Sequence, residues 1–287
     1  MTDISRRDAL GTLGSLGAAL AAPLMVPLER SAGAQRVGRI NQSVCRWCYG
    51  RIPLEDLCVA AKSYGYKSVE LLGENEWATA KKHGLDVAIA NSFGAIPIGF
   101  NRPDHHDKLA ADGERLIPLA AASGVTKIVV FSGNRAGMSD GEGIANCIAG
   151  LKRLMPSAER HGVTLCMEML NSKVDHTDYH ADHTAWAVEV VKGVASPGFR
   201  LLYDIYHMQV MEGDVIRTIR DNFAHIAHFH TAGVPGRNEI DDSQELHYPR
   251  LMTAIADLGY AGYVGQEFIP KRDPLTSLKE AFAICDV

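Results

Sequence analysis

The sequence predicts one α/β domain in which parallel strands close into a (β/α)8 barrel, also called a TIM barrel. Beyond residue 37, short runs of apolar and β-branched residues alternate eight times with longer helical runs. Strands that alternate with helices are typical of parallel strands joined by crossover connections. Eight such units in about 250 residues match the usual size of this barrel.

Eight strands and eight helices are expected in order along the domain, which covers residues 35–287. The expected strands are 38–45, 67–71, 86–92, 127–131, 163–169, 200–204, 226–231 and 263–268. The expected helices are 54–64, 74–83, 105–123, 143–161, 181–192, 214–222, 248–258 and 274–284. Glycines such as Gly65 and Gly162 stand where these helices should end, as helix C-termini prefer.

An open, doubly wound sheet is the alternative architecture. It has no positive support, because no glycine-rich phosphate-binding motif lies between the first expected strand and the first expected helix. The sequence contains neither a low-complexity linker nor a shift in composition within residues 38–287. The sequence therefore predicts a single domain.

Composition and charge limit the classes of partner. The chain has 287 residues, of which 46% are hydrophobic and 22% charged, as in ordinary globular proteins. Its net charge of −5 leaves no basic surplus to neutralise phosphates, so no nucleic-acid partner is expected. Six cysteines in a chain of this length do not indicate a disulfide scaffold. The Cys45–Cys48 pair favours core packing over a zinc site, because no second such pair exists.

Residues 1–34 have the pattern of an export signal. Paired arginines at Arg6 and Arg7 precede a mildly apolar run rich in glycine and alanine, and the small residues Ala32-Gly33-Ala34 follow. The paired arginines resemble the twin-arginine (Tat) class. We therefore expect a periplasmic or exported protein, or a cytoplasmic one if the signal is not used. Two prolines interrupt the apolar run, so no stable membrane anchor is expected after processing.

Four polar residues stand near the ends of the last four expected strands. Glu168, Asp204, His230 and Glu267 are separated by 36, 26 and 37 residues, about one strand–helix unit each. In a barrel, the ends of the strands meet at one mouth, where catalytic groups gather. Three converging carboxylates repel one another unless a cation lies between them. The pattern therefore predicts one divalent ion, with Mg²⁺, Mn²⁺, Co²⁺ and Zn²⁺ all compatible.

Three motifs surround these positions: Asp204-Ile-Tyr-His207, His228-Phe-His230-Thr-Ala-Gly-Val-Pro-Gly-Arg237 and Val264-Gly-Gln-Glu267. Over residues 38–287 the chain resembles the hydroxypyruvate isomerase family of the xylose isomerase-like barrel superfamily, which contains sugar isomerases and epimerases. The resemblance implies that Glu168, Asp204, His230 and Glu267 are the metal ligands. Hydroxypyruvate isomerases have glutamine at the position of His230, whereas keto-sugar 3-epimerases have histidine, so the substrate stays open.

The predicted reaction moves a proton between adjacent carbons of a small hydroxy-carbonyl compound or keto sugar. The ion would bind the substrate's carbonyl and hydroxyl oxygens and stabilise an enediolate. Glu168 and Glu267 are the expected general base and acid, an assignment that the family resemblance also implies. Three further residues are expected to contact the substrate: His207 from the loop after its strand, Arg237, and Glu70 at the end of the second strand.

Other functions remain open at this stage. A ketose 3-epimerase would use the same barrel and the same intermediate. A non-catalytic, exported sugar-binding protein is a second alternative, although binding alone does not need the opposed pair Glu168 and Glu267. A metal-dependent phosphodiesterase would need a basic surface. A homo-oligomer is compatible with the sequence. Phe93, Phe131 and the polar segment 175–183 are expected to line the mouth.

Overall fold

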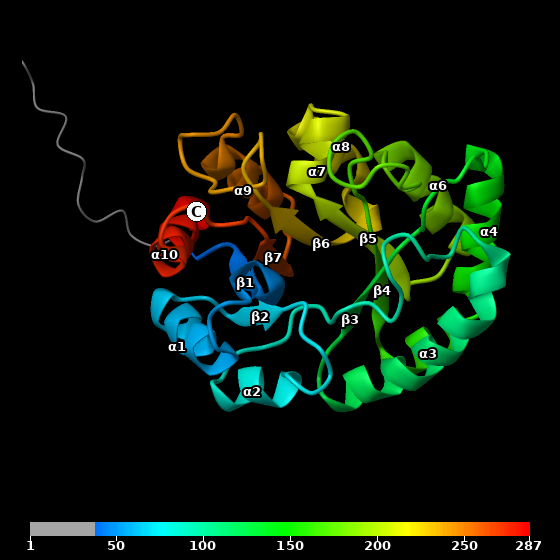
Figure 1. Cartoon of the computed structure of the whole chain (residues 1–287), viewed down its shortest axis with the longest axis horizontal. Helices are drawn as coiled ribbons and strands as arrows, with labels where there is room; N and C mark the ends of the chain where they lie inside the picture. The colour runs from blue at the N-terminus through cyan, green and yellow to red at the C-terminus, as the bar shows by residue number, and fades with distance from the viewer. Residues whose placement is uncertain (1–37) are drawn as a thin grey trace, which may run out of the picture. The chain divides into compact units, whose positions relative to one another are not determined.

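The computed structural model describes residues 38–287, whose strands curl into a single sheet surrounded by helices (Figure 1). The sheet has seven parallel strands in the order β2-β1-β7-β6-β5-β4-β3. These strands are β1 (Asn41–Cys45), β2 (Ser68–Glu70), β3 (Lys127–Val130), β4 (Thr164–Glu168), β5 (Phe199–Asp204), β6 (Ile226–Thr231) and β7 (Tyr263–Gln266). The predicted barrel architecture is therefore confirmed.

An irregular segment at residues 86–91 joins the two outer strands of this sheet, β2 and β3. On one side, the backbone N–H of Asp86 donates to the carbonyl of Lys67 at 2.9 Å. On the other side, the N–H of Ala90 donates to the carbonyl of Lys127, also at 2.9 Å. The segment thus takes the place of the third of the eight expected strands.

The expectation of a regular strand over 86–92 was wrong, because this segment makes only isolated bridges. The N–H of Ala88 donates to the side-chain hydroxyl of Ser68 at 2.8 Å, where a regular ladder would use a backbone carbonyl. Leu71, just after β2, has a φ of +54°, which interrupts the extended conformation there. These two departures prevent a continuous ladder.

Ten α-helices in the described residues surround the sheet (Figure 1). They are α1 (Leu54–Tyr64), α2 (Trp77–Lys82), α3 (Pro103–Ala122), α4 (Asp140–Lys152), α5 (Met155–His161), α6 (Thr184–Val194), α7 (Ile205–Met211), α8 (Val215–Asn222), α9 (Tyr248–Asp257) and α10 (Pro274–Cys285). Two short 3₁₀ helices, η1 and η2, cover Arg46–Tyr49 and Phe223–His225. None of these helices is long and apolar enough to cross a membrane.

The single helix expected over 143–161 is two helices, α4 and α5. Pro156 lies in the first turn of α5, where its missing N–H costs nothing. Inside a continuous helix, the ring of Pro156 would clash with the carbonyl of Lys152, which is the last residue of α4. The proline therefore explains where the helical run divides.

Helix α7 follows β5 without a loop, which the sequence did not predict. Asp204 ends β5 and also caps α7, because its Oδ1 accepts a hydrogen bond from the backbone N–H of His207 at 3.1 Å. His207, expected in a loop, therefore lies in the first turn of this helix. The cap fixes one oxygen of Asp204 and leaves the other free.

The barrel interior contains a small apolar cluster beneath the mouth. Its buried members are Cys45, Leu71, Ile89, Val129, Cys166 and Leu202, and Cys48 packs against them. Cys45 is buried in this cluster and Cys48 is partly buried against it, which agrees with the core-packing interpretation. At the other end of the domain, the N–H of Arg39 donates to the carbonyl of Val287 at 3.0 Å and ties the two ends of the described chain together.

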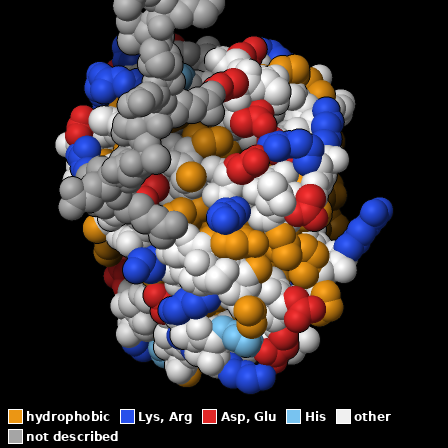
Figure 2. All heavy atoms as spheres, turned by 90° about the vertical axis from the view of Figure 1, so that its left-hand side faces the viewer, with side chains coloured by type: hydrophobic (Ala, Val, Ile, Leu, Met, Phe, Trp, Pro, Cys, Tyr) orange, Lys and Arg blue, Asp and Glu red, His pale blue; other side chains and the backbone are white. Residues whose placement is uncertain are grey.

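The surface carries charges of both signs. On the face drawn in Figure 2, Lys and Arg side chains are interspersed with Asp and Glu side chains and with scattered hydrophobic residues. Residues 1–34, the predicted export signal, lie outside the described part of the chain. The signal, and the localisation that follows from it, therefore stay predictions.

Candidate metal and substrate site

The structure brings the four predicted metal ligands together. Glu168 ends β4, Asp204 ends β5, His230 lies in β6 and Glu267 directly follows β7. One ligand atom from each residue lies within 4.8 Å of the ligand atoms of the others, and all four side chains are buried. Strand register explains the convergence, because Asp204 and His230 are paired residues of the neighbouring strands β5 and β6.

Three of these residues each hold one buried atom without a hydrogen bond. These atoms are Oε1 of Glu168, Oδ2 of Asp204 and Nδ1 of His230. Buried polar atoms normally have a partner, and a cluster without one calls for a missing group. Oxygens and one imidazole nitrogen form a donor set that Mg²⁺, Mn²⁺, Co²⁺ or Zn²⁺ accepts. The residues therefore fit a divalent ion.

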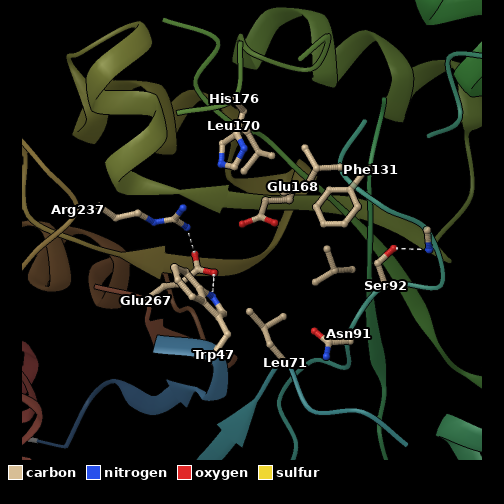
Figure 3. Close-up of a pocket in the computed structure, with 13 residues that line it drawn as sticks. Trp47, Leu71, Asn91, Ser92, Phe131, Glu168, Leu170, His176, Arg237 and Glu267 are labelled. Atoms are coloured by element: carbon tan, nitrogen blue, oxygen red, sulfur yellow. Dashed lines mark hydrogen bonds and ion pairs between the residues drawn. The ribbon is translucent and has the colours of Figure 1, made fainter. Parts of the chain in front are cut away.

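Glu267 is the most heavily contacted of the four. The indole N–H of Trp47 donates to its Oε1 at 2.7 Å, and Nη2 of Arg237 donates to its Oε2 at 2.7 Å (Figure 3). Nδ1 of His230 lies 2.9 Å from the same Oε2, and Nη2 of Arg237 lies 3.5 Å from Oδ2 of Asp204. Arg237 is thus a cation at the edge of the carboxylate cluster, and its substrate contact stays a prediction.

The carboxyl groups respond differently to this environment. Burial raises the pKa of Glu168, and the charge of Glu267 raises it further. Burial raises the pKa of Asp204 to about 8, although Arg237 opposes the shift. Burial would also raise the pKa of Glu267, but the charges of His230 and Arg237 hold it well below its usual range. A bound divalent ion would favour the ionised form of all three.

Glu70 ends β2 as expected, but it lies behind His230 and does not line the pocket. The side chain is fully buried, and its Oε1 accepts hydrogen bonds from Nε2 of His228 at 2.9 Å and of His230 at 2.8 Å. Because Glu70 is buried behind His230, its position does not support the expected contact with the substrate. The bond to Nε2 leaves Nδ1 of His230 as the nitrogen that faces the other ligands.

Gly265 in β7 makes room for this arrangement. A Cβ at this position would lie 2.2 Å from Oε1 of Glu70 and 2.9 Å from Cδ2 of His230. Only glycine allows β7 to pass so close to the two side chains. The requirement could not be read from the sequence, because it depends on a contact between β2 and β7.

His207 is fully buried and lies beside the ligand cluster. Its Nδ1 is 2.7 Å from Nδ2 of Asn171 and accepts the backbone N–H of Asn171 at 3.2 Å, which places the ring proton on Nε2. That Nε2 has no hydrogen-bond partner and lies 3.6 Å from Oδ2 of Asp204. The predicted substrate contact of His207 stays a prediction.

A pocket of about 510 Å³ opens onto the carboxylates from the carboxyl ends of the strands. Its lining residues are Trp47, Leu71, Asn91, Ser92, Gly94, Ile96, Val129, Phe131, Glu168, Leu170, His176, Arg237 and Glu267. Phe131 and His176 come from segments expected at the mouth. The place of Trp47 in the pocket was not predicted. No sequence pattern shows that this residue of the Cys45–Cys48 segment contacts Glu267, 220 positions away.

The same fold is known in other proteins. Residues 58–285 match the sequence profile of the xylose isomerase-like TIM barrel. The chain belongs to the xylose isomerase-like TIM barrel family. This assignment covers most of the described domain and agrees with the resemblance seen in the sequence.

Relatives in this family include named isomerases. The chain is 31% identical over 229 residues to a Drosophila melanogaster protein named "Putative hydroxypyruvate isomerase". The match covers 76% of this chain and 86% of the relative. A Xenopus laevis protein of the same name is 34% identical over 117 residues, and there the match spans 41% of this chain and 42% of the relative. The 2-oxo-tetronate isomerase of Cupriavidus necator is 28% identical over 75% of this chain and 87% of its own.

Solved structures of the family share the fold. An AP endonuclease of family 2 from Brucella melitensis superimposes with a TM-score of 0.75 at 24% identity, over 83% of this chain and 97% of its own. A 3-keto-D-glucoside 4-epimerase from E. coli gives a TM-score of 0.72 at 21% identity, over 85% of this chain and 98% of its own. At these identities the likeness establishes the barrel alone.

Proposed function

We propose that this protein is a divalent-metal-dependent isomerase that moves a proton between adjacent carbons of a small hydroxy-carbonyl compound. The observation that carries the proposal is the convergence of Glu168, Asp204, His230 and Glu267, whose ligand atoms lie within 4.8 Å of one another and include buried oxygens of Glu168 and Asp204 without a hydrogen bond. Relatives named as hydroxypyruvate and 2-oxo-tetronate isomerases support this class of reaction.

The four converging side chains would hold a single divalent ion. When bound, that ion would supply Lewis acidity, which polarises a carbonyl group and favours negative charge on neighbouring oxygens. Oδ2 of Asp204 and Nδ1 of His230 are the atoms best placed to hold it, because their companion atoms are already fixed by His207 and Glu70. Glu168 and Glu267 would serve as ligands through one oxygen and face the substrate with the other.

Glu168 and Glu267 would carry out the proton transfer. Both line the pocket, and they project into it from different strands (Figure 3). One carboxylate takes the proton from the carbon that bears the hydroxyl group, and the freed electron pair forms the double bond of an enediolate. The other carboxyl group returns a proton to the adjacent carbon. One C–H bond breaks and one forms, and a proton passes from the hydroxyl oxygen to the former carbonyl oxygen, so the carbonyl and hydroxyl groups exchange places without an oxidant.

Arg237 would orient the substrate and shield the negative charge. Its guanidinium carbon lies over the rings of Trp47 and Tyr206, at 5.2 and 5.7 Å from the ring centres. The two rings hold the guanidinium in place, and it can offer parallel N–H donors to a substrate oxygen or carboxylate. We propose that Arg237 moves part of its hydrogen bonding from Glu267 to the substrate.

Deuterium uptake from D₂O tests this proposal. The metal-loaded protein is expected to exchange the carbon-bound proton of hydroxypyruvate, 2-oxo-tetronate or a ketose, measured by NMR. Glu168→Gln and Glu267→Gln should each lower the rate at least about 100-fold, as expected for the loss of a general acid or base. The control Glu189→Gln, at an exposed glutamate, should keep the wild-type rate. Near-normal turnover in both site variants with metal bound would contradict the proposal.

A ketose 3-epimerase is the second candidate, and His230 is the observation that favours it, since keto-sugar epimerases of the resembled family have histidine at this position. Both reactions pass through the same kind of enediolate. Product analysis separates them, because isomerisation moves the carbonyl group whereas epimerisation leaves it in place and inverts the neighbouring carbon.

A further inference from the structure

The pocket has two chemically different sides. Glu168, Glu267 and Arg237 lie on one side, and Leu71 and Phe131 lie on the other (Figure 3). The apolar side is formed by Leu71, Ile96, Val129 and Phe131, which we call the apolar wall. The carboxylate side accounts for the proposed proton transfer, but the apolar wall has no part in it.

The apolar wall is a fixed part of the barrel. Leu71 and Val129 belong to the buried cluster inside the barrel, and Phe131 packs against that cluster. Leu71 has a φ of +54°, an uncommon conformation for leucine, while its N–H still donates to the carbonyl of Ile89 at 2.9 Å. Neighbours on both sides therefore hold the wall in position. A preformed apolar surface of this kind is typical of ligand pockets.

The wall offers little to a chain of hydroxyl groups. Apart from Trp47, Glu168, Arg237 and Glu267, the polar residues that line the pocket are Asn91, Ser92 and His176 (Figure 3). The hydroxyl of Ser92 already accepts a hydrogen bond from the N–H of Gly94 at 2.9 Å. A linear sugar would place some of its hydroxyl groups against the apolar wall, which cannot bind them, whereas a carbon-rich group there would gain from leaving water.

The size of the pocket also favours a substrate larger than a three-carbon acid. A three-carbon hydroxy acid has about seven non-hydrogen atoms, so even if each took up the roughly 30 Å³ of a whole water molecule in the liquid, the compound would fill only about 200 Å³. The pocket measures about 510 Å³, so more than half of it would stay empty around such a molecule. The unfilled part includes the side that the apolar wall lines.

We propose that the natural substrate is a hydroxy-carbonyl compound that carries an aryl or alkyl substituent. Its reacting carbons lie at Glu168 and Glu267, and its substituent lies on the apolar wall against Phe131. This inference rests on the proposed function for the chemistry of the reacting end. The substituent itself is assigned from the shape and composition of the pocket.

Three α-hydroxy ketones test the inference. They are hydroxyacetone, which has no substituent, 2-hydroxyacetophenone, which carries a phenyl ring, and D-fructose, which is of similar size to the phenyl ketone but polar. With Mn²⁺-loaded protein in D₂O, kcat/KM for proton exchange should be at least about tenfold higher for 2-hydroxyacetophenone than for the other two. Equal or faster exchange of D-fructose or hydroxyacetone would overturn the inference.

Substitutions in the wall provide the matched comparison. Phe131→Asn and Ile96→Asn should each reduce the preference for 2-hydroxyacetophenone over hydroxyacetone about tenfold. Two positions are used because one of the variants could fold poorly. The control is Ile98→Asn, since Ile98 is 48% exposed and does not line this pocket. A preference that the two wall variants leave unchanged would contradict the role of the wall.

Binding separates this inference from the proposed function. Calorimetry with Mn²⁺-loaded protein ranks the affinities of the same three compounds whether or not any of them reacts. If none exchanges deuterium but 2-hydroxyacetophenone binds more tightly than D-fructose, the proposed activity is wrong and the apolar wall still binds the substituent. If D-fructose binds as tightly or more tightly, the inference is wrong even where exchange occurs.

Discussion

Glu70 is buried and is hydrogen-bonded to both His228 and His230. Its Oε1 accepts Nε2 of both His228 and His230, and it has no contact with the pocket. A carboxylate behind a metal-binding imidazole fixes the ring and makes it a stronger ligand. We therefore interpret Glu70 as a positioning residue for His230 and propose that it acts through the affinity for metal.

The variant Glu70→Gln tests this role. It keeps the size of the side chain but removes the charge, so the affinity for Mn²⁺ should fall about 10- to 100-fold. Titration calorimetry on the metal-free protein measures this directly, without a turnover assay. Glu74→Gln, at an exposed glutamate that pairs with Arg115, is the control. An unchanged affinity for Mn²⁺ in Glu70→Gln would show that Glu70 has no positioning role.

Substitution of Gly265 should weaken Mn²⁺ binding, as substitution of Glu70 should. A Cβ at this position would lie 2.2 Å from Oε1 of Glu70, so Gly265→Ala must displace Glu70 or His230. We expect a loss of about 1–3 kcal/mol in the free energy of unfolding, as for overpacking in a core, together with weaker Mn²⁺ binding. Urea unfolding and calorimetry measure the two effects.

Gly141→Ala is the matched control for that substitution. Gly141 lies in α4, and a Cβ there meets nothing within 4 Å. Alanine is favoured over glycine inside a helix, so Gly141→Ala should be neutral or stabilise by up to about 1 kcal/mol. If Gly265→Ala behaves like Gly141→Ala, the close packing of β7 on Glu70 is not important.

The convergence of the four candidate ligands could be predicted from the sequence because each member occupies the same place in a repeated unit. Glu168, Asp204, His230 and Glu267 all stand where a parallel strand ends, and the barrel brings such positions together. The supporting residues could not be predicted in this way. Glu70 also ends a strand, but whether it faces the mouth or lies behind His230 depends on register and side-chain packing across the barrel.

Among the larger elements, the loop after β6 depends on one buried acid. Glu239 accepts the backbone N–H groups of Lys271 and Arg272 at 2.9 and 3.0 Å and the hydroxyl of Ser277 at 2.9 Å. These bonds tie the loop to the start of α10. Burial favours the neutral acid, but the hydrogen bonds outweigh it and lower the pKa of Glu239.

The lowered pKa of Glu239 in the folded state makes the free energy of unfolding depend on pH in a defined way. The stabilisation by Glu239 is present above the pKa of the unfolded chain and is lost as the pH falls through the lower, folded-state pKa. Glu239→Gln should therefore lower the free energy of unfolding by about 1–3 kcal/mol at pH 7, and by less at acidic pH. Urea unfolding at several pH values, with the exposed Glu114→Gln as control, measures the difference. A gap that widens toward acidic pH would contradict this account.

Helices and strands were predicted well where the local sequence determines their structure, and poorly where contacts with distant residues determine it. The strand β4 and the helix α1 follow from apolar runs and their flanking residues. Segment 86–91 has strand composition but loses its ladder to the hydroxyl of Ser68, which lies on another element. Pro156 does carry a local signal, and giving it full weight would have divided the helix expected over 143–161.

For the whole molecule, a divalent ion at the proposed site would link metal binding to folding. Glu168, Asp204 and Glu267 come from different strands and converge only in the folded chain, so an ion that binds there stabilises the native state. The stabilisation depends on the ratio of free ion to Kd, and at about 100 times Kd it amounts to about 2.7 kcal/mol. For a domain of this size, each kcal/mol raises Tm by about 2–4 °C.

Removal and return of the ion should therefore move the melting temperature. Chelation followed by Mn²⁺ at about 100 times Kd is expected to raise Tm by about 5–11 °C, measured by calorimetric scanning. Asp204→Asn should lose most of this increase while it keeps the cap of α7, because asparagine caps a helix as well as aspartate does. Since the variant separates the ligand role of Asp204 from its structural role, a full Mn²⁺-dependent shift in Asp204→Asn would place the ion elsewhere. No shift in the wild-type protein would mean that the four residues do not form a metal site.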